Sequence, residues 1–185
     1  VIFYQTNLLF IDPLYLFKIW NGGMSFHGGL GGIIIAMYAF CLKYRVRFFY
    51  LADLVSISAP IGLFFGRISN FINSELYGKV TDFPLAVIYP FVDNQPRHPS
   101  QLYESFFEGI ILFIILFFYF KKKPKNYKIG NISALFLIFY SIFRFSIEYL
   151  REPDLHLGLY FNHFSMGQLL CIPLLIAGIA IIYRK

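Results

Sequence analysis

The chain has 185 residues, of which 58% are hydrophobic, 21% aromatic and only 14% charged, and its mean hydropathy is well above zero. Because a soluble domain of this length carries about 25% charged residues, the composition excludes an ordinary soluble fold and indicates an integral membrane protein. The net charge of +6 does not indicate nucleic acid binding, since the basic residues flank apolar segments as membrane-topology determinants do.

The apolar segments predict an all-α membrane protein, a helical bundle with about five transmembrane helices in one membrane domain over 1–185. Residues 8–20 are too short and too interrupted to span, and they predict a helix at the membrane interface. A polar and aromatic region rich in proline, 66–102, separates the second span from the third. The chain opens with Val1 inside a pattern, so we expect an N-terminal part to precede it. The predicted spans are 28–42, 48–65 (interrupted by Asp53 and Pro60), 102–120, 132–150 and 164–183.

Three basic clusters orient these spans. With five spans, all three clusters fall on one side of the membrane, which the positive-inside rule makes cytoplasmic. The glycine-rich turn at 22–32, the 66–102 region and the loop at 151–163 then lie at the outer face. The clusters are Lys43, Arg45 and Arg47; Lys121, Lys122, Lys123, Lys125 and Lys128; and Arg184 and Lys185.

Some chemistries have no support in the sequence. Cys41 and Cys171 lie in apolar runs and form neither a disulfide framework nor a metal-ligand spacing. His156 and His163 stand in the last outer loop without a ligand partner at metal-binding spacing, so we read them as loop residues. A nucleophile elbow and a Walker loop are both missing from the sequence.

The stretch 66–78 is the most unusual part of the chain. It follows an apolar segment directly and places Arg67, Asn70, Asn73 and Glu75 within nine residues. Polar side chains at a membrane boundary need partners, so this stretch is either glue between helices or part of a site. We favour a site.

Two further spans carry polar side chains on one helix face. Tyr140, Arg144 and Glu148 are spaced i, i+4, i+8, with Arg144 roughly 9 Å inside the outer end, where an arginine can hold a lipid phosphate. The alternative is a self-satisfying Arg144–Glu148 ion pair. In the third span, Glu104 and Glu108 share a face with Gln101; we assign Glu104 to the site and Glu108 to a polar seam between helices.

The turn at 22–32 has six glycines in eleven residues, which allow close backbone approach to a ligand or a helix. Gly28 and Gly32 also fit helix packing through small residues. His27 is suited to act as a general base near neutral pH, although a single histidine is more often structural.

Four motifs in chain order carry a family resemblance. They are Gly-Gly-Met-Ser-Phe-His-Gly-Gly from residue 22, Gly-Arg-x-x-Asn-Phe-x-Asn-x-Glu-x-x-Gly from 66, Arg-His-Pro-Ser-Gln-Leu-Tyr-Glu from 97 and Arg-Phe-x-x-Glu-x-x-Arg-x-Pro-Asp from 144. Together they resemble the prolipoprotein diacylglyceryl transferase family. Ser69 stands where the family pattern has glycine.

The resemblance implies a bacterial inner-membrane enzyme with about seven spans and a site that faces the outer leaflet. It would transfer the diacylglyceryl group of phosphatidylglycerol to the lipobox cysteine in the signal peptide of a prolipoprotein, forming a thioether and releasing glycerol phosphate. No metal, nucleotide or organic cofactor is implied.

By resemblance, Arg67 and Arg144 clamp the phosphate, and His27 is the first candidate for the base that activates the cysteine, with His98 the second. The same likeness implies that a further set of residues orients the substrate and the arginines; these are Gly28, Asn70, Glu75, Glu104, Tyr140 and Glu148.

Two other functions compete with this one. A non-catalytic phospholipid carrier or transporter would use the same arginines for headgroups, but transporters often show internal repeats, which this sequence lacks. A structural membrane subunit would leave the gathering of polar residues at one leaflet to chance.

Overall fold

The computed structural model describes residues 26–122, 124, 127–153 and 164–184, with the backbone alone at 26–28. The chain divides into two compact units, Val1–Leu51 and Ala52–Lys185. In the first unit, helix α2 (Phe26–Tyr44) confirms the predicted helix at 28–42. A turn with Arg45 at φ 54° joins it to the start of the next helix. The interfacial helix predicted at 8–20 lies outside the described residues.

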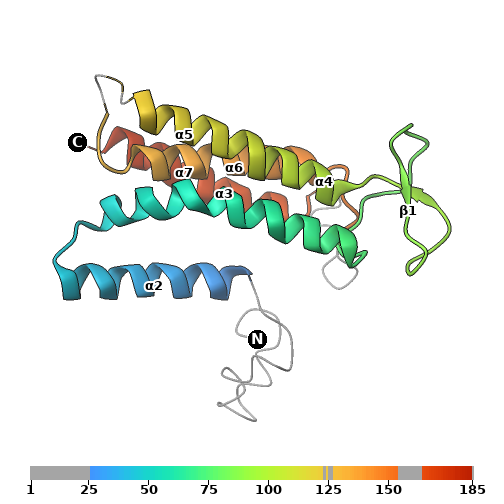
Figure 1. Cartoon of the computed structure of the whole chain (residues 1–185), viewed down its shortest axis with the longest axis horizontal. Helices are drawn as coiled ribbons and strands as arrows, with labels where there is room; N and C mark the ends of the chain where they lie inside the picture. The colour runs from blue at the N-terminus through green and yellow to red at the C-terminus, as the bar shows by residue number, and fades with distance from the viewer. Residues whose placement is uncertain (1–25, 123, 125–126, 154–163, 185) are drawn as a thin grey trace, which may run out of the picture. The chain divides into compact units, whose positions relative to one another are not determined.

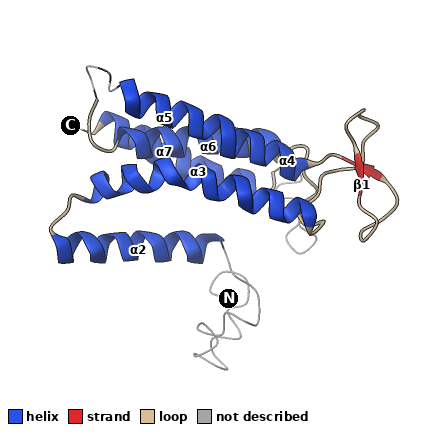
Figure 2. Cartoon of the chain, in the orientation of Figure 1, coloured by secondary structure: helices blue, strands red, loops and turns tan. Residues whose placement is uncertain are grey.

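Helices also dominate the second unit (Figures 1 and 2). They are α3 (Phe48–Ile72), whose first turn belongs to the first unit, α4 (Ser100–Glu104), the π-helix η3 (Ser105–Ile111), α5 (Leu112–Lys122), α6 (Asn131–Ile147) and α7 (Met166–Tyr183). Three helices of the described residues are long and apolar enough to cross a membrane: Phe48–Ile72, Ser100–Lys122 and Met166–Tyr183. Gly29–Tyr44 and Asn131–Ile147 are shorter apolar helices. The chain is therefore a mostly helical membrane protein, as predicted.

Two predicted boundaries were wrong. Helix α3 continues through Asp53 and Pro60 to Ile72, so the first seven residues of the stretch predicted as an irregular polar region are helical. Proline is tolerated in membrane helices because surrounding groups can satisfy the freed carbonyl. Helix α6 ends at Ile147, which leaves Arg144 in its last turn, about 4.5 Å from the helix end instead of the predicted 9 Å.

The core of the second unit lies between α5 and α6. Leu112, Leu116, Ile132 and Tyr140 form a buried cluster, against which partly buried side chains of α3 and α7 pack. Helices α6 and α7 approach closely at Gly178, where a Cβ atom would lie 2.9 Å from the carbonyl oxygen of Ala134. A glycine is required at this crossing.

A buried carboxylate joins α3 to the start of α6. Asp53 accepts hydrogen bonds from the backbone N–H groups of Gly130 (2.7 Å) and Ser133 (2.8 Å), from the Ser133 hydroxyl and from the Tyr127 hydroxyl (3.5 Å). Gly130, the residue before α6, has φ 102° and no capping side chain of its own. The Asp53 side chain therefore serves as the N-cap of α6 from a neighbouring helix.

The polar region between α3 and α4 folds around a short strand pair. Strand β1 (Val87–Ile88) pairs antiparallel with β2 (Pro96–Arg97), and Figure 1 shows the pair beyond the end of α4. The Gly78 N–H donates to the His98 carbonyl oxygen (2.9 Å), and Gly78 also bridges to Arg151. A Cβ at Gly78 would collide with the His98 backbone, so only glycine fits.

Arg97 holds this polar region together. Its guanidinium pairs with Asp93 (2.7 Å) and Glu152 (3.2 Å), donates to the Gly78 carbonyl oxygen and lies over the Tyr77 ring. The hydrogen bonds from Arg97 lower the pKa of Asp93, and the same pairing raises the pKa of Arg97. Arg97 therefore has a structural role.

Candidate active site

Helix α4 and the π-helix η3 present one polar face to the bundle. Ser100, Gln101, Glu104, Ser105 and Glu108 are all buried on it. Residues four apart lie above one another on a helix, so these side chains form one line along α4 and η3. π-Helical turns such as η3 are frequent at functional sites. The line has two parts, which differ in what they contact.

Ser100 and Gln101, at the N-terminal end of this line, anchor the turn that follows α3. Ser100 Oγ donates to the Leu76 carbonyl oxygen (2.9 Å), and Gln101 Nε2 donates to the Glu75 carbonyl oxygen (2.6 Å). Gln101 Oε1 in turn accepts from the Tyr89 hydroxyl. These two residues have structural partners and are not the centre of the site.

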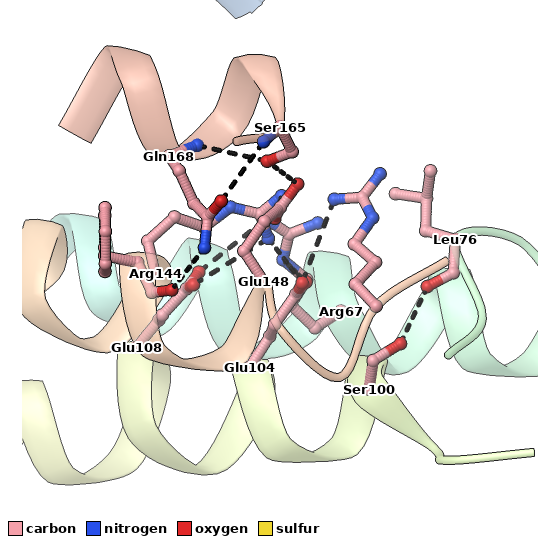
Figure 3. A network of polar contacts seen from close by, with 11 residues as sticks. Arg67, Leu76, Ser100, Glu104, Glu108, Arg144, Glu148, Ser165 and Gln168 are labelled. Carbon is pink, nitrogen blue, oxygen red and sulfur yellow. Dashed lines mark hydrogen bonds and ion pairs between the residues drawn. The ribbon is translucent and has the colours of Figure 1, made fainter. Parts of the chain in front are cut away.

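Glu104 and Glu108, farther along the same line, lie beside two arginines from other helices (Figure 3). Glu104 receives Arg67 of α3 on one carboxylate oxygen (Nε–Oε2, 2.8 Å) and Arg144 of α6 on the other. Glu108, fully buried, lies 3.6 Å from Arg67 Nη2 and 4.0 Å from Arg144 Nη1. Two guanidinium groups predicted to act together are thus held over one pair of carboxylates.

Glu148 completes the support of Arg144. Arg144 Nη2 lies 2.7 Å from Glu148 Oε2, and Glu148 Oε1 accepts from the Ser165 hydroxyl (2.8 Å). Ser165 and Gln168 form a capping box at the start of α7, which fixes this hydroxyl. The predicted ion pair between Arg144 and Glu148 exists, but Glu104 also takes part, so the pair does not satisfy itself alone.

Two residues in this network were not predicted as site residues. Glu108 was assigned to a polar seam between helices, and the structure places it between helices beside both arginines. Arg151 is buried and lies 3.8 Å from Glu104. Arg151 lies beyond the end of α6, and it is the second arginine of the motif that starts at residue 144, which was the signal available in the sequence. We call Arg67, Glu104, Glu108, Arg144, Glu148 and Arg151 the arginine–glutamate cluster.

Other predicted residues lie around the cluster. Tyr140 is one turn before Arg144 but belongs to the apolar core, where its ring stacks on Phe136 at 5.7 Å. Asn70 Nδ2 donates to Glu75 Oε2 (3.0 Å), and this pair shapes the turn after α3. Ser69 is inside α3 with its carbonyl oxygen bonded to Asn73 N–H, so helical backbone there needs no glycine.

The structure describes the side chain of only one of the two candidate bases, His98. Within the described part of the chain, the His98 ring contacts Tyr103 (Nδ1 to Oη, 3.4 Å) and Phe83, and no member of the cluster. The backbone of His27 and Gly28 is in α2, whereas the His27 side chain lies outside the described residues. Among the described residues, no group of three or more histidine, cysteine or acidic side chains could hold a metal ion.

Comparisons with known proteins agree on one family. The family model described as prolipoprotein diacylglyceryl transferase matches residues 1–184. The chain is 52% identical over 183 residues to a phosphatidylglycerol–prolipoprotein diacylglyceryl transferase of Aeromonas hydrophila, covering 99% of this chain and 66% of that protein. For the proteins of the same name from Vibrio campbellii and Rickettsia akari, identity is 55% over 179 residues and 49% over 178 residues. These cover 97% and 96% of this chain and 64% and 69% of those proteins, so the chain spans about two thirds of the length of these relatives.

Proposed function

The chain belongs to the prolipoprotein diacylglyceryl transferase family, and from this premise we propose that it forms the phosphate-binding part of such an enzyme. The whole protein transfers the diacylglyceryl group of phosphatidylglycerol to the lipobox cysteine of a prolipoprotein signal peptide. The cysteine sulfur bonds to the carbon of the diacylglyceryl unit that carries the phosphate, and the bond between this carbon and the phosphate oxygen breaks. The electron pair leaves with glycerol phosphate, and the thiol proton passes to a base.

The observation that carries this proposal is the convergence of Arg67 and Arg144. The leaving phosphate gains negative charge as the bond breaks, and prepositioned guanidinium groups stabilise such charge. The two arginines come from different helices, yet both contact Glu104. Within the described residues, Arg67 Nη1 has no hydrogen-bond or ion-pair partner, and the side chain is 15% exposed. Arg67 thus retains donors for a phosphate oxygen.

The glutamates act as positioning residues. Glu104 and Glu148 hold the two guanidinium groups by ion pairs on their flat edges, which fixes the direction of the remaining donors. Asn70 and Glu75 set the turn beside Arg67, and Tyr140 packs in the apolar core one turn before Arg144. This arrangement fits the roles that the family resemblance implies.

The base that receives the thiol proton is His27 or His98. Within the described residues His98 contacts Tyr103 and Phe83 and no member of the arginine–glutamate cluster. We therefore favour His27. His27→Ala should abolish transfer, whereas His98→Ala should leave measurable transfer; the opposite ranking would exchange the two roles.

The protein is a multi-pass protein of the bacterial inner membrane with its site at the outer leaflet. The arginine–glutamate cluster lies at the late part of α3 and of α6, whereas the basic segments follow α2, α5 and α7. By the positive-inside rule these segments are cytoplasmic, so the cluster lies toward the other face. The five apolar segments, with α4, η3 and α5 counted as one, each span the membrane, and the full-length protein has about seven spans.

The test uses the full-length protein in membranes with phosphatidylglycerol and a lipobox peptide that carries either cysteine or serine. Mass spectrometry of the peptide and an assay for glycerol phosphate are run together. A cysteine-dependent gain of one diacylglyceryl group, in step with glycerol phosphate, supports the transferase. Binding of phosphatidylglycerol with neither product would identify a carrier and overturn the proposal.

A further inference from the structure

The Glu108 carboxylate is the least satisfied group in the arginine–glutamate cluster. Its side chain is fully buried, and within the described residues neither carboxylate oxygen has a hydrogen-bond donor. The nearest guanidinium nitrogens are 3.6 Å and 4.0 Å away, which is beyond hydrogen-bond length. A buried carboxylate without donors is costly as an anion unless nearby cations compensate it.

The charges of the cluster balance before any ligand arrives. It contains three arginines and three glutamates, and each of them is in ion-pair contact with at least one residue of opposite charge in the cluster. A phosphate ester that binds to Arg67 and Arg144 adds at least one negative charge. In a buried site this excess is unfavourable, so binding requires a compensating change within the cluster.

Glu108 is the carboxylate that can lose its charge at the lowest cost. Glu104 contacts three arginines, and Glu148 holds Arg144 and the Ser165 hydroxyl, so protonation of either would break short contacts. Protonation of Glu108 breaks no hydrogen bond and gives it an O–H donor. It also releases the pull of Glu108 on the two arginines that must turn to the phosphate.

We propose that Glu108 takes up one proton from water when a phosphate ester binds between Arg67 and Arg144. The step forms one O–H bond at Glu108 and breaks no bond of the ligand. This inference deepens the proposed function and rests on its phosphate-binding step alone. Glu108 is thereby a positioning residue, because it acts on the ligand through the two arginines.

The groups that face Glu108 in the described residues come from four elements. The charged groups are Arg144 on α6, Glu148 directly after its end, Arg67 on α3 and Glu104 on α4. The phenol of Tyr140 on α6 and the thiol of Cys171 on α7 are neutral groups within electrostatic range. The arginines stay charged at all pH values of the test. The carboxylates are therefore the groups able to take the proton, and Glu108 is the one without donors.

The first experiment needs no variant. The purified full-length protein in phosphatidylcholine nanodiscs is titrated with short-chain phosphatidylglycerol between pH 6 and pH 9, by calorimetry in two buffers of different ionisation heat. We expect close to one proton taken up per lipid bound, and an affinity that falls about tenfold per pH unit where free Glu108 is ionised. Binding without proton uptake anywhere in this range would overturn the proposal.

A variant assigns the proton to its group. Glu108→Gln keeps the shape of the side chain and cannot ionise, so binding should become independent of pH and release or take up no proton. Glu152→Gln, which removes a carboxylate paired with Arg97 outside the cluster, should bind as the wild type does. Proton uptake that persists in Glu108→Gln would overturn the assignment.

A second arm separates the lipid from its product, since both carry a phosphate ester. Soluble glycerol phosphate is titrated under the same conditions. Proton uptake with phosphatidylglycerol supports coupling at the lipid headgroup, and uptake with glycerol phosphate alone supports coupling at the released product. Transfer without proton-coupled binding overturns this inference and leaves the proposed function standing. Proton-coupled binding without transfer overturns the proposed function and leaves this inference standing.

Discussion

Asp53 and Glu108 are both buried carboxylates in the same helical unit, but their surroundings differ. Asp53 accepts four hydrogen bonds, two of them from the backbone at the start of α6. Glu108 accepts none from the described residues and faces two arginines at 3.6 Å and 4.0 Å. On α3, Asp53 and Arg67, which lies beside Glu108, are 14 residues apart, or roughly 21 Å along the helix.

The difference separates a structural carboxylate from one that can respond to a ligand. Neutral backbone donors hold the Asp53 side chain in one place, so it stabilises the fold. The cluster around Glu108 balances charge with charge, and an incoming anion can replace one carboxylate as the partner of an arginine. Substitutions at Asp53 should therefore change the stability of the fold, whereas substitutions in the arginine–glutamate cluster should change the rate of transfer.

The largest expected effect is on transfer, in Arg144→Lys. Lysine keeps the charge, so the protein should remain folded, but it cannot hold Glu104, Glu148 and a phosphate with one planar fork. We expect a loss of about 100-fold or more in the rate of peptide modification. Arg45→Lys, in the turn after α2, should keep the wild-type rate; equal rates for the two variants would contradict a phosphate role for Arg144.

Asp53→Ala should affect stability instead. The substitution leaves the N–H groups of Gly130 and Ser133 buried without their acceptor, which costs about 3 kcal/mol in the free energy of unfolding. The measurement is unfolding in mixed micelles with increasing denaturing detergent. Transfer per folded molecule should stay at the wild-type rate. A folded Asp53→Ala protein without activity would contradict a purely structural role for Asp53.

Gly167→Ala should act on the cluster through Glu148. A Cβ at Gly167 would lie 2.8 Å from Glu148 Oε1, so the carboxylate must move away from Ser165 and Arg144. We expect a loss of about tenfold in transfer with little change in stability. Gly62→Ala is the matched control, since its Cβ would meet nothing within 4 Å, and it should behave as the wild type.

The smallest effect concerns the polar region and pH. Arg97 lowers the pKa of Asp93 below its ordinary value of 3.8, so the pairing stabilises the fold fully above that value and is lost as the pH falls through the lowered pKa. Hydrogen exchange at β1 and β2 should quicken only in strong acid. Asp93→Asn should produce the same change at neutral pH, and unchanged exchange in this variant would show that the ion pair does not order the strands.

Much of this protein follows from its sequence alone. Long apolar segments cannot be left in water, so the helices at 28–42, 48–65, 102–120, 132–150 and 164–183 were predicted close to where they occur. The four motifs also identified the family, which the comparisons confirm. Local spacing placed Glu104 and Glu108 on one face of one helix, because a helix brings residues four apart into line.

The tertiary structure alone decided which of these polar residues meet. Periodicity describes one helix at a time, so it could not show that Arg67 and Arg144 share Glu104, or that Arg151 joins them. For the same reason the sequence did not show that two arginines lie beside Glu108, and it made Asp53 look like an interruption of a span. Their roles depend on donors from other helices, and those distances are fixed by packing and not by sequence spacing.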